Sequence, residues 1–146
     1  MSVNVFVDTN VIVYSHVSVE AGKHKTALSL LQDSLVDDNI MVSTQVLGEF
    51  YSAMTKYKRS HDEISRFMKE IIRDSNVVEV SLPIVESCLI LKDSYGYSYW
   101  DSLILAAALA NNCTVLYSED MQHNQVIEGK LTIVNPFADM PEKAKK

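Results

Sequence analysis

Short runs of β-branched and aromatic residues alternate along this chain with longer stretches in which apolar residues recur every three or four positions. The first run, residues 3–7, ends at an aspartate and is typical of a buried strand. Similar short runs follow along the chain, and Pro136 stops the last of them. The pattern predicts strands over residues 3–7, 40–42, 77–80, 114–117 and 131–134.

Segments with helical periodicity lie between these strands. The clearest begins with Ser60 and Glu63, which form a capping box ahead of apolar residues at helical spacing. Leu28, Leu31 and Leu35 form an apolar stripe on another. The segment 99–111 is apolar nearly all round, so we expect it to be buried. The helices predicted in this way cover residues 10–16, 25–36, 44–57, 60–72, 81–95 and 99–111.

The alternation of strands and helices predicts an α/β fold in three layers. A mostly parallel sheet of four to five strands would be covered by helices on both faces. With 146 residues the chain is long enough for one domain, which we assign to residues 1–137. The Lys-rich residues 138–146 are predicted to be a flexible tail. In such folds the functional site lies beyond the carboxyl ends of the strands.

Composition narrows the class of protein. Hydrophobic residues make up 47% and charged residues 22%, which are ordinary globular values, and no apolar stretch is long enough to span a bilayer. Cys88 and Cys113 match no zinc or redox spacing, so we interpret both as buried thiols of a cytoplasmic protein. A net charge of −6 argues weakly against binding nucleic acid. Acidic residues that hold cations also count as negative, so the charge leaves the question open.

Four acidic residues stand where the fold rule directs attention. Asp8 follows the first predicted strand, Asp120 follows the fourth, and Asp101 opens the apolar helix. Glu49 lies on the helix after the second strand. Each acid taken alone has an ordinary interpretation as a turn, cap or surface residue. Asp101, for example, could close a capping box with Ser98.

Asp101 is the hardest of the four to explain as a surface residue, because it is the only charged residue between positions 94 and 118. If the acids converge, their carboxylate oxygens suit a hard cation such as magnesium or manganese. Such an ion can hold a phosphodiester and ionise an attacking water. The sequence contains no phosphate-binding Gly-rich loop, no GxSxG and no HExxH motif.

Four segments, in order, resemble the conserved segments of PIN domains. They are residues 5–10 (VFVDTN), 46–50 (VLGEF), 97–104 (YSYWDSLI) and 116–120 (LYSED). Each segment alone is a weak signal, but all four in order are specific. The resemblance extends over nearly the whole chain, from residue 3 to residue 137.

The resemblance implies a Rossmann-like PIN fold and a magnesium- or manganese-dependent ribonuclease. It implies supporting roles for Asn10 and for Ser118, where many relatives have threonine and the hydroxyl is retained. The role of Glu119 stays open. The carboxylates that it assigns to catalysis and metal binding are Asp8, Glu49, Asp101 and Asp120.

The resemblance also implies partners. The family includes bacterial toxins that a small antitoxin protein inhibits, and the chain has a suitable size. Residues 120–125 and 135–137 are similar to a stand-alone bacterial subgroup. PIN domains often form dimers, so we expect a homodimer. The alternatives are an inactive PIN-like module that binds RNA or a protein, and a receiver domain. A receiver would need paired acids at the first strand, which this chain lacks.

Basic and aromatic residues near these segments are candidates for contacts with RNA. Lys56, Lys58 and Arg59 could hold the RNA backbone, although cations also favour a helix C-terminus for electrostatic reasons alone. Aromatic side chains could stack on unpaired bases or serve in the core. The aromatic candidates are Tyr14, Tyr97, Tyr99 and Trp100.

Overall fold

A six-stranded sheet forms the centre of the computed structural model, which describes residues 2–140. The strand order is β3-β2-β1-β4-β6-β5, and every neighbouring pair is parallel except β5 with β6. The bounds are β1 (Asn4–Val7), β2 (Asn39–Ser43), β3 (Asn76–Val78), β4 (Val115–Tyr117), β5 (Val126–Ile127) and β6 (Leu131–Val134).

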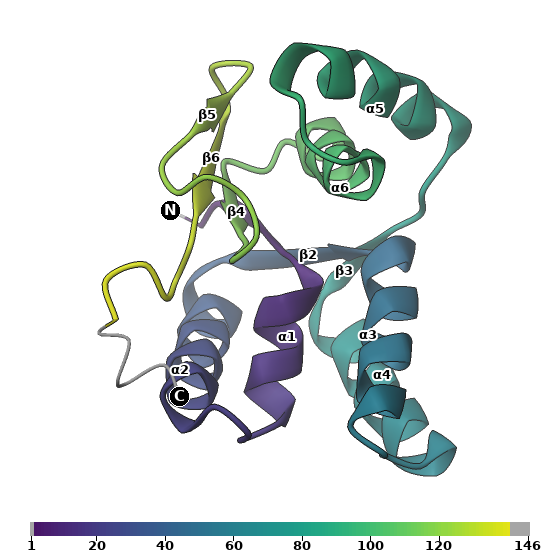
Figure 1. The fold of residues 1–146 in the computed structure, drawn as a ribbon, viewed down its shortest axis with the longest axis vertical. Helices are drawn as coiled ribbons and strands as arrows, with labels where there is room; N and C mark the ends of the chain where they lie inside the picture. The colour runs from purple at the N-terminus through teal and green to yellow at the C-terminus, as the bar shows by residue number, and fades with distance from the viewer. Residues whose placement is uncertain (1, 141–146) are drawn as a thin grey trace.

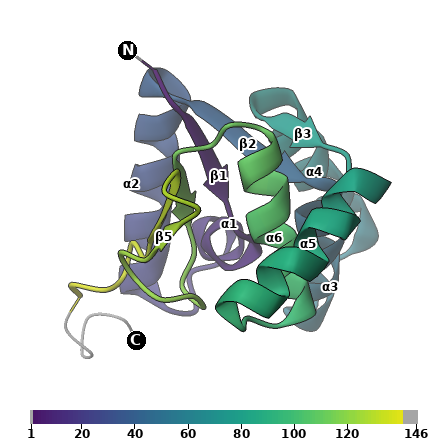
Figure 2. The ribbon, with the colours of Figure 1, turned by 90° about the horizontal axis from the view of Figure 1, so that it is seen from above.

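Helices cover both faces of this sheet. Figure 1 shows α1 to α4 below the sheet and α5 and α6 above it, and in Figure 2 α6 lies over the strands with α5 outside it. The mostly parallel three-layer fold predicted from the sequence is therefore confirmed. The bounds are α1 (Thr9–His16), α2 (Ala21–Asp37), α3 (Thr44–Lys56), α4 (His61–Asp74), α5 (Leu82–Tyr95) and α6 (Tyr99–Ala110).

Two elements differ from the sequence-based expectation. The helix predicted from residue 25 begins at Ala21, although Glu20 at its N-cap makes no side-chain capping bond that would signal the start. Strand β5 was not predicted, because two residues carry no periodicity. It forms by pairing with β6 across a tight turn in which Glu128 and Gly129 both have positive φ, 54° and 65°. Such a turn matches the twist of an antiparallel hairpin.

The strand order places a switch point between β1 and β4. The chain winds from β1 toward β2 and β3 on one side, and β4 and β6 lie on the other. The backbone N–H of Asp8 donates to the carbonyl of Tyr117 at 2.9 Å, so the two strands end side by side. At such a point the connections diverge and leave a crevice, which is where open α/β sheets bind their ligands.

Helix α6 is buried as its composition predicted. Residues 102–108 are all buried, and they pack in one core with β1 and β4. Cys88 and Cys113 are both buried free thiols, as expected. Along residues 2–140, every helix is too short or too polar to cross a membrane.

The first residues of the predicted tail, 138–140, form a turn at the end of the described chain. Met140 packs against the core, and its sulfur accepts a hydrogen bond from Thr26 at 3.5 Å. The rest of the predicted tail, 141–146, lies outside the described residues.

Candidate metal centre

Asp8 lies at the floor of the crevice, where β1 ends and α1 begins. It is the N-cap of α1, and its Oδ1 accepts a hydrogen bond from the backbone N–H of Thr9 at 2.7 Å. Its Oδ2 accepts from the hydroxyl of Ser118 at 2.8 Å. The side chain is 5% exposed. Burial, and secondarily the charges of Glu49 and Asp101, raise its pKa to about 7 against the pull of the two hydrogen bonds.

Glu49 reaches the same crevice from α3. That helix starts at Ser43, whose hydroxyl accepts from the N–H of Val46 at 3.3 Å, directly after the parallel strand β2. The hydroxyl of Thr9 donates to Oε1 of Glu49 at 2.7 Å, and Nε2 of Gln45 donates to Oε2 at 3.3 Å. Both carboxylate oxygens are therefore oriented by neighbours.

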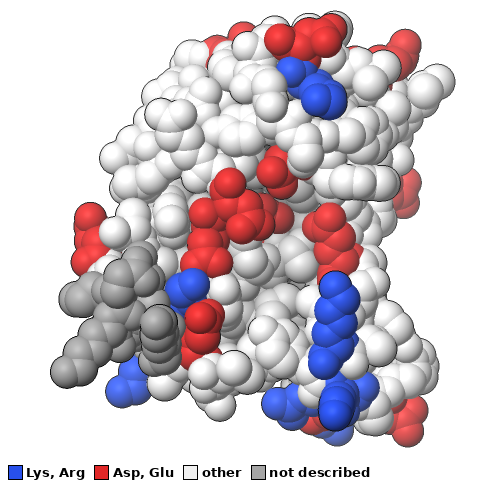
Figure 3. All heavy atoms as spheres, in the orientation of Figure 1, with Lys and Arg blue, Asp and Glu red and all other residues white. Residues whose placement is uncertain are grey.

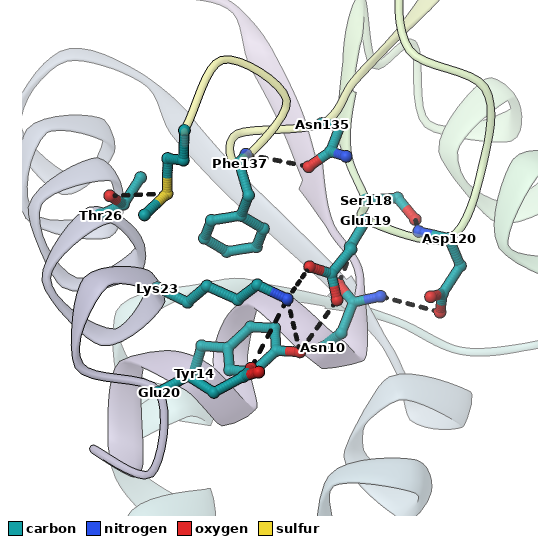
Figure 4. Close-up of polar contacts among 11 residues, drawn as sticks. Asn10, Tyr14, Glu20, Lys23, Thr26, Ser118, Glu119, Asp120, Asn135 and Phe137 are labelled. Atoms are coloured by element: carbon teal, nitrogen blue, oxygen red, sulfur yellow. Dashed lines mark hydrogen bonds and ion pairs between the residues drawn. The ribbon is translucent and has the colours of Figure 1, made fainter. Parts of the chain in front are cut away.

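Asp101 and Asp120 complete the set from the other side of the crevice. Ser98 caps α6 by accepting a hydrogen bond from the backbone N–H of Asp101 at 3.1 Å, so Asp101 lies in the first turn of this helix. Burial, then the charges of Asp120 and Glu49, raise the pKa of Asp101. The amide of Asn10 donates to Oδ2 of Asp120 at 2.9 Å, as Figure 4 shows.

All four carboxylates line one cleft of about 1050 Å³. Figure 3 looks onto this face and shows acidic side chains gathered around the hollow at its middle. The cleft thus joins residues that are up to 112 positions apart in the chain, from Asp8 to Asp120. Burial first, and then the neighbouring carboxylates, raise the pKa values of Asp8 and Asp101, and acids perturbed in this way in a cleft are candidates for a functional site.

The donor set fits a hard divalent cation better than zinc. The acids offer only oxygen, whereas zinc sites in proteins usually include nitrogen or sulfur ligands. Between residues 2 and 140, no three His, Cys, Asp or Glu side chains lie close enough together to form a ready-made metal site. Magnesium binds through one or two carboxylates and keeps several waters, so an open cleft lined by oxygen suits it.

Asn10 and Ser118 lie where the resemblance implied supporting roles. Asn10 accepts from the N–H of Glu119 at 3.4 Å while donating to Asp120, so it links two consecutive residues of the loop after β4. Ser118 is fully buried, donates to Asp8, and accepts from the N–H of Asp120 at 3.3 Å. Each side chain therefore fixes the position of a cleft carboxylate.

Glu119 points toward Lys23 and Tyr14 and away from Asp120, as Figure 4 shows. It forms an ion pair with Lys23 of α2 and accepts from the hydroxyl of Tyr14 at 2.9 Å. Lys23 is further held over the ring of Tyr14, 4.9 Å from its centroid. The sequence left the role of Glu119 open. In the structure Glu119 is the ion-pair partner of Lys23, a residue that the sequence analysis did not single out.

Of the three basic residues suggested for RNA contact, Lys56 alone lines the cleft. Lys58 lies in the turn after α3 with a φ of 61°, and Arg59 pairs with Glu63 at 3.4 Å. Thr9 and Gln45, which orient Glu49, were not assigned a role from the sequence. Thr9 belongs to the VFVDTN segment and Gln45 stands one helical turn before Glu49, so both positions carried a signal.

Comparison of the sequence with known families identifies the family of this chain. The sequence model of the family described as the PIN domain matches residues 5–128, which includes all four cleft acids. The chain belongs to the PIN-domain family. Comparison with curated protein sequences gives no significant match.

Solved structures agree with this PIN fold. A toxin–antitoxin complex from Klebsiella pneumoniae matches with a TM-score of 0.68 and 20% identity, over 90% of this chain and 97% of that one. VapC20 of Mycobacterium tuberculosis, described as a toxin that cleaves the sarcin–ricin loop, gives 0.64 and 22%, over 80% and 89%. VapBC2 of Rickettsia felis, bound to a promoter DNA fragment, gives 0.61 and 19%, over 80% and 88%. Similarity at this level of identity shows a common fold.

Proposed function

We propose that this PIN domain is an endoribonuclease that uses magnesium or manganese and hydrolyses RNA phosphodiester bonds. The observation that carries the proposal is the convergence of four carboxylates from four separate elements in one cleft. The raised pKa values of Asp8 and Asp101 support it, because burial and then the neighbouring acids disfavour their charged forms, which a bound cation would favour.

In this proposal Asp8, Glu49, Asp101 and Asp120 would hold the cation. The bound cation would supply an activated water and neutralise the leaving oxygen. Asn10 and Ser118 keep Asp120 and Asp8 oriented toward the cleft, and Thr9 and Gln45 do the same for Glu49. Lys56, at the edge of the cleft, would hold a neighbouring phosphate.

We further propose that the protein acts as the toxin of a toxin–antitoxin pair. The support is that solved structures of similar fold are described as a toxin that cleaves the sarcin–ricin loop and as a toxin–antitoxin complex. The partner would be a small antitoxin protein. If a short reading frame lies immediately upstream of the gene, co-expression with it should yield a complex that no longer cleaves RNA.

The test of the nuclease proposal is cleavage of single-stranded RNA by purified protein with magnesium or manganese. Chelator should stop the reaction. Asp8→Asn and Asp101→Asn should each lower the rate by about two orders of magnitude or more, the usual effect of losing one preorganised charge at a reacting centre. The matched control is Asp33→Asn, which removes one negative charge from the exposed face of α2, away from the cleft.

Wild-type rates in either cleft variant would overturn the site assignment. Metal-dependent RNA binding without cleavage would favour instead a PIN-like module that has lost activity and binds RNA. Binding of neither metal nor RNA would leave a module that binds a protein partner.

A further inference from the structure

The cleft extends well beyond the four carboxylates. Along α3 it is lined by Gln45 and Glu49 at one end and by Lys56 at the other. The helical rise places Lys56 about 10 Å from Glu49 along the axis. A single hydrated cation and one phosphate do not need this length, so the cleft has room for the neighbouring parts of a strand.

Trp100 lines this cleft directly beside Asp101. Its side chain is 59% exposed, although an indole is among the largest apolar groups in a protein. Leaving that much apolar surface in water is unfavourable by comparison with burial. The exposed ring is therefore a candidate contact surface of the same site.

Trp100 is also held in place. Its carbonyl accepts a hydrogen bond from Nε2 of Gln45 at 3.0 Å, the same amide that orients Glu49. Its ring packs edge-to-face on Tyr99, with the centroids 4.9 Å apart and the planes at 87°. A ring fixed in this way loses little conformational freedom when a flat ligand stacks on it.

We infer that Trp100 is a stacking platform for a nucleobase next to the phosphate held at the carboxylates, and that the substrate must present this base unpaired. The inference rests on the proposed ribonuclease function and adds the side chain on which an unpaired base of the substrate stacks. The strand lies along α3, with the base at the Gln45 end and a further phosphate near Lys56. A base inside a duplex is already stacked and paired, so it is not free to reach the ring.

Trp100 is the only tryptophan of the chain, so its fluorescence reports on this position alone. In an Asp8→Asn background with magnesium, single-stranded RNA should quench the emission in a saturable titration. An oligonucleotide of the same length with its bases removed should compete for the site and leave the emission unchanged. A fully paired duplex of the same sequence should not quench.

Steady-state cleavage by the otherwise wild-type protein gives the second readout. Trp100→Ala should raise KM about 5- to 150-fold with little change in kcat, which corresponds to the ~1–3 kcal/mol of one base stacked on an aromatic ring. Trp100→Phe should restore most of the loss, because phenylalanine keeps a stacking face. Ile72→Ala on α4 truncates another half-exposed apolar side chain, one outside the cleft, and should behave like wild type.

The inference is overturned if Trp100→Ala leaves KM unchanged while RNA is cleaved, or if the base-free oligonucleotide quenches as well as RNA. A blue shift of the emission with protein concentration, without RNA, would assign the ring to a contact between copies and also overturn it. Quenching by RNA in a protein that cleaves none would refute the nuclease proposal and leave the platform intact.

Discussion

Burial distinguishes Asp8 from the surface acids of this PIN domain. A carboxyl whose pKa is raised from 3.8 to about 7 keeps its proton in the folded, metal-free protein over a range where the unfolded chain has lost it. A bound cation favours the charged form and lowers this pKa. In the proposed metal site, the same side chain would therefore link proton binding, metal binding and folding.

The first prediction concerns the stability of the metal-free protein against pH. Between about pH 4 and pH 7 the folded state binds more protons at Asp8 than the unfolded state does, so the contribution of this group to stability is present at low pH and is lost as pH rises. The loss is on the order of 4 kcal/mol for a shift from 3.8 to about 7. Urea unfolding in chelator should show wild type losing stability relative to Asp8→Asn across this window.

Other acidic residues also make stability depend on pH, in wild type and variant alike. The test is therefore the difference in the free energy of unfolding between wild type and Asp8→Asn. A difference in the free energy of unfolding that stays constant from pH 4 to pH 7 would contradict the raised pKa.

The second prediction concerns Asp101, where charge and shape can be separated. Asp101→Asn removes a charge that burial, Asp120 and Glu49 all disfavour, while nearly keeping the shape of the side chain. The variant should melt at a higher temperature than wild type in chelator, and should gain less from manganese because it binds the ion more weakly. Thermal melts of both proteins with chelator and with manganese measure this.

A helix-capping acid outside a metal site would behave in the opposite way. Its loss would leave the melting temperature unchanged or lower, with the response to manganese intact. An equal response to manganese in the two proteins would remove Asp101 from the proposed metal site.

At the scale of elements, the loop after β4 is fastened on both sides. Asn10 of α1 holds Asp120, and Lys23 of α2 holds Glu119. The side chains of Lys23 and Glu119 are only 12% and 23% exposed, so their pairing is shielded from solvent. The consecutive acids of this loop thus face different neighbours, and only one of them lines the cleft.

The third prediction separates the structural role of Glu119 from the proposed catalytic role of Asp120. Glu119→Gln should lower stability by about 1–3 kcal/mol, because it leaves the partly buried Lys23 without its counter-charge. It should keep RNA cleavage near the wild-type rate, whereas Asp120→Asn should lose it. The double variant Lys23→Met with Glu119→Gln should be more stable than the sum of the single effects predicts. Additive losses, or loss of cleavage in Glu119→Gln, would contradict this.

At the scale of the whole molecule, α5 carries apolar side chains that nothing in residues 2–140 covers. Leu82, Leu89 and Ile90 share one face of this outermost helix and are 71%, 53% and 66% exposed. Figure 1 shows α5 on the outside of α6. The exposed acids Glu86 and Asp93 lie on the same side of α5, so this face is mixed, and its apolar groups are of the kind that a protein partner covers.

The fourth prediction is a homodimer at micromolar concentration, with this face of α5 in the interface. Leu89→Lys and Ile90→Lys should each shift the equilibrium to monomer, because a charge would be buried without a partner. Val36→Lys on α2, at a position 84% exposed, should leave it unchanged. Light scattering over the micromolar range measures the mass, and a monomeric wild type throughout would refute the prediction.

The sequence by itself determined the elements of this protein. Apolar periodicity located all six helices of residues 2–140 and five of the six strands, since each depends on a local alternation of buried and exposed positions. The rule for the carboxyl ends of strands pointed to Asp8 and Asp120, and an isolated charge in an apolar helix pointed to Asp101.

Only the tertiary structure decided how these elements meet. Strand β5 exists because β6 offers it a pairing edge, and Lys23 reaches Glu119 because α2 packs beside α1. The raised pKa of Asp8 comes from the packing of side chains distant in the chain, which no local pattern encodes. The tertiary structure also decides that Lys56 lines the cleft while Lys58 and Arg59 do not. Lys56 lies on the face of α3 that borders the cleft, and the turn after α3 carries the chain away from it. Local conformational preferences thus determine the helices and strands, while long-range packing determines the positions and the ionisation of the side chains in the cleft.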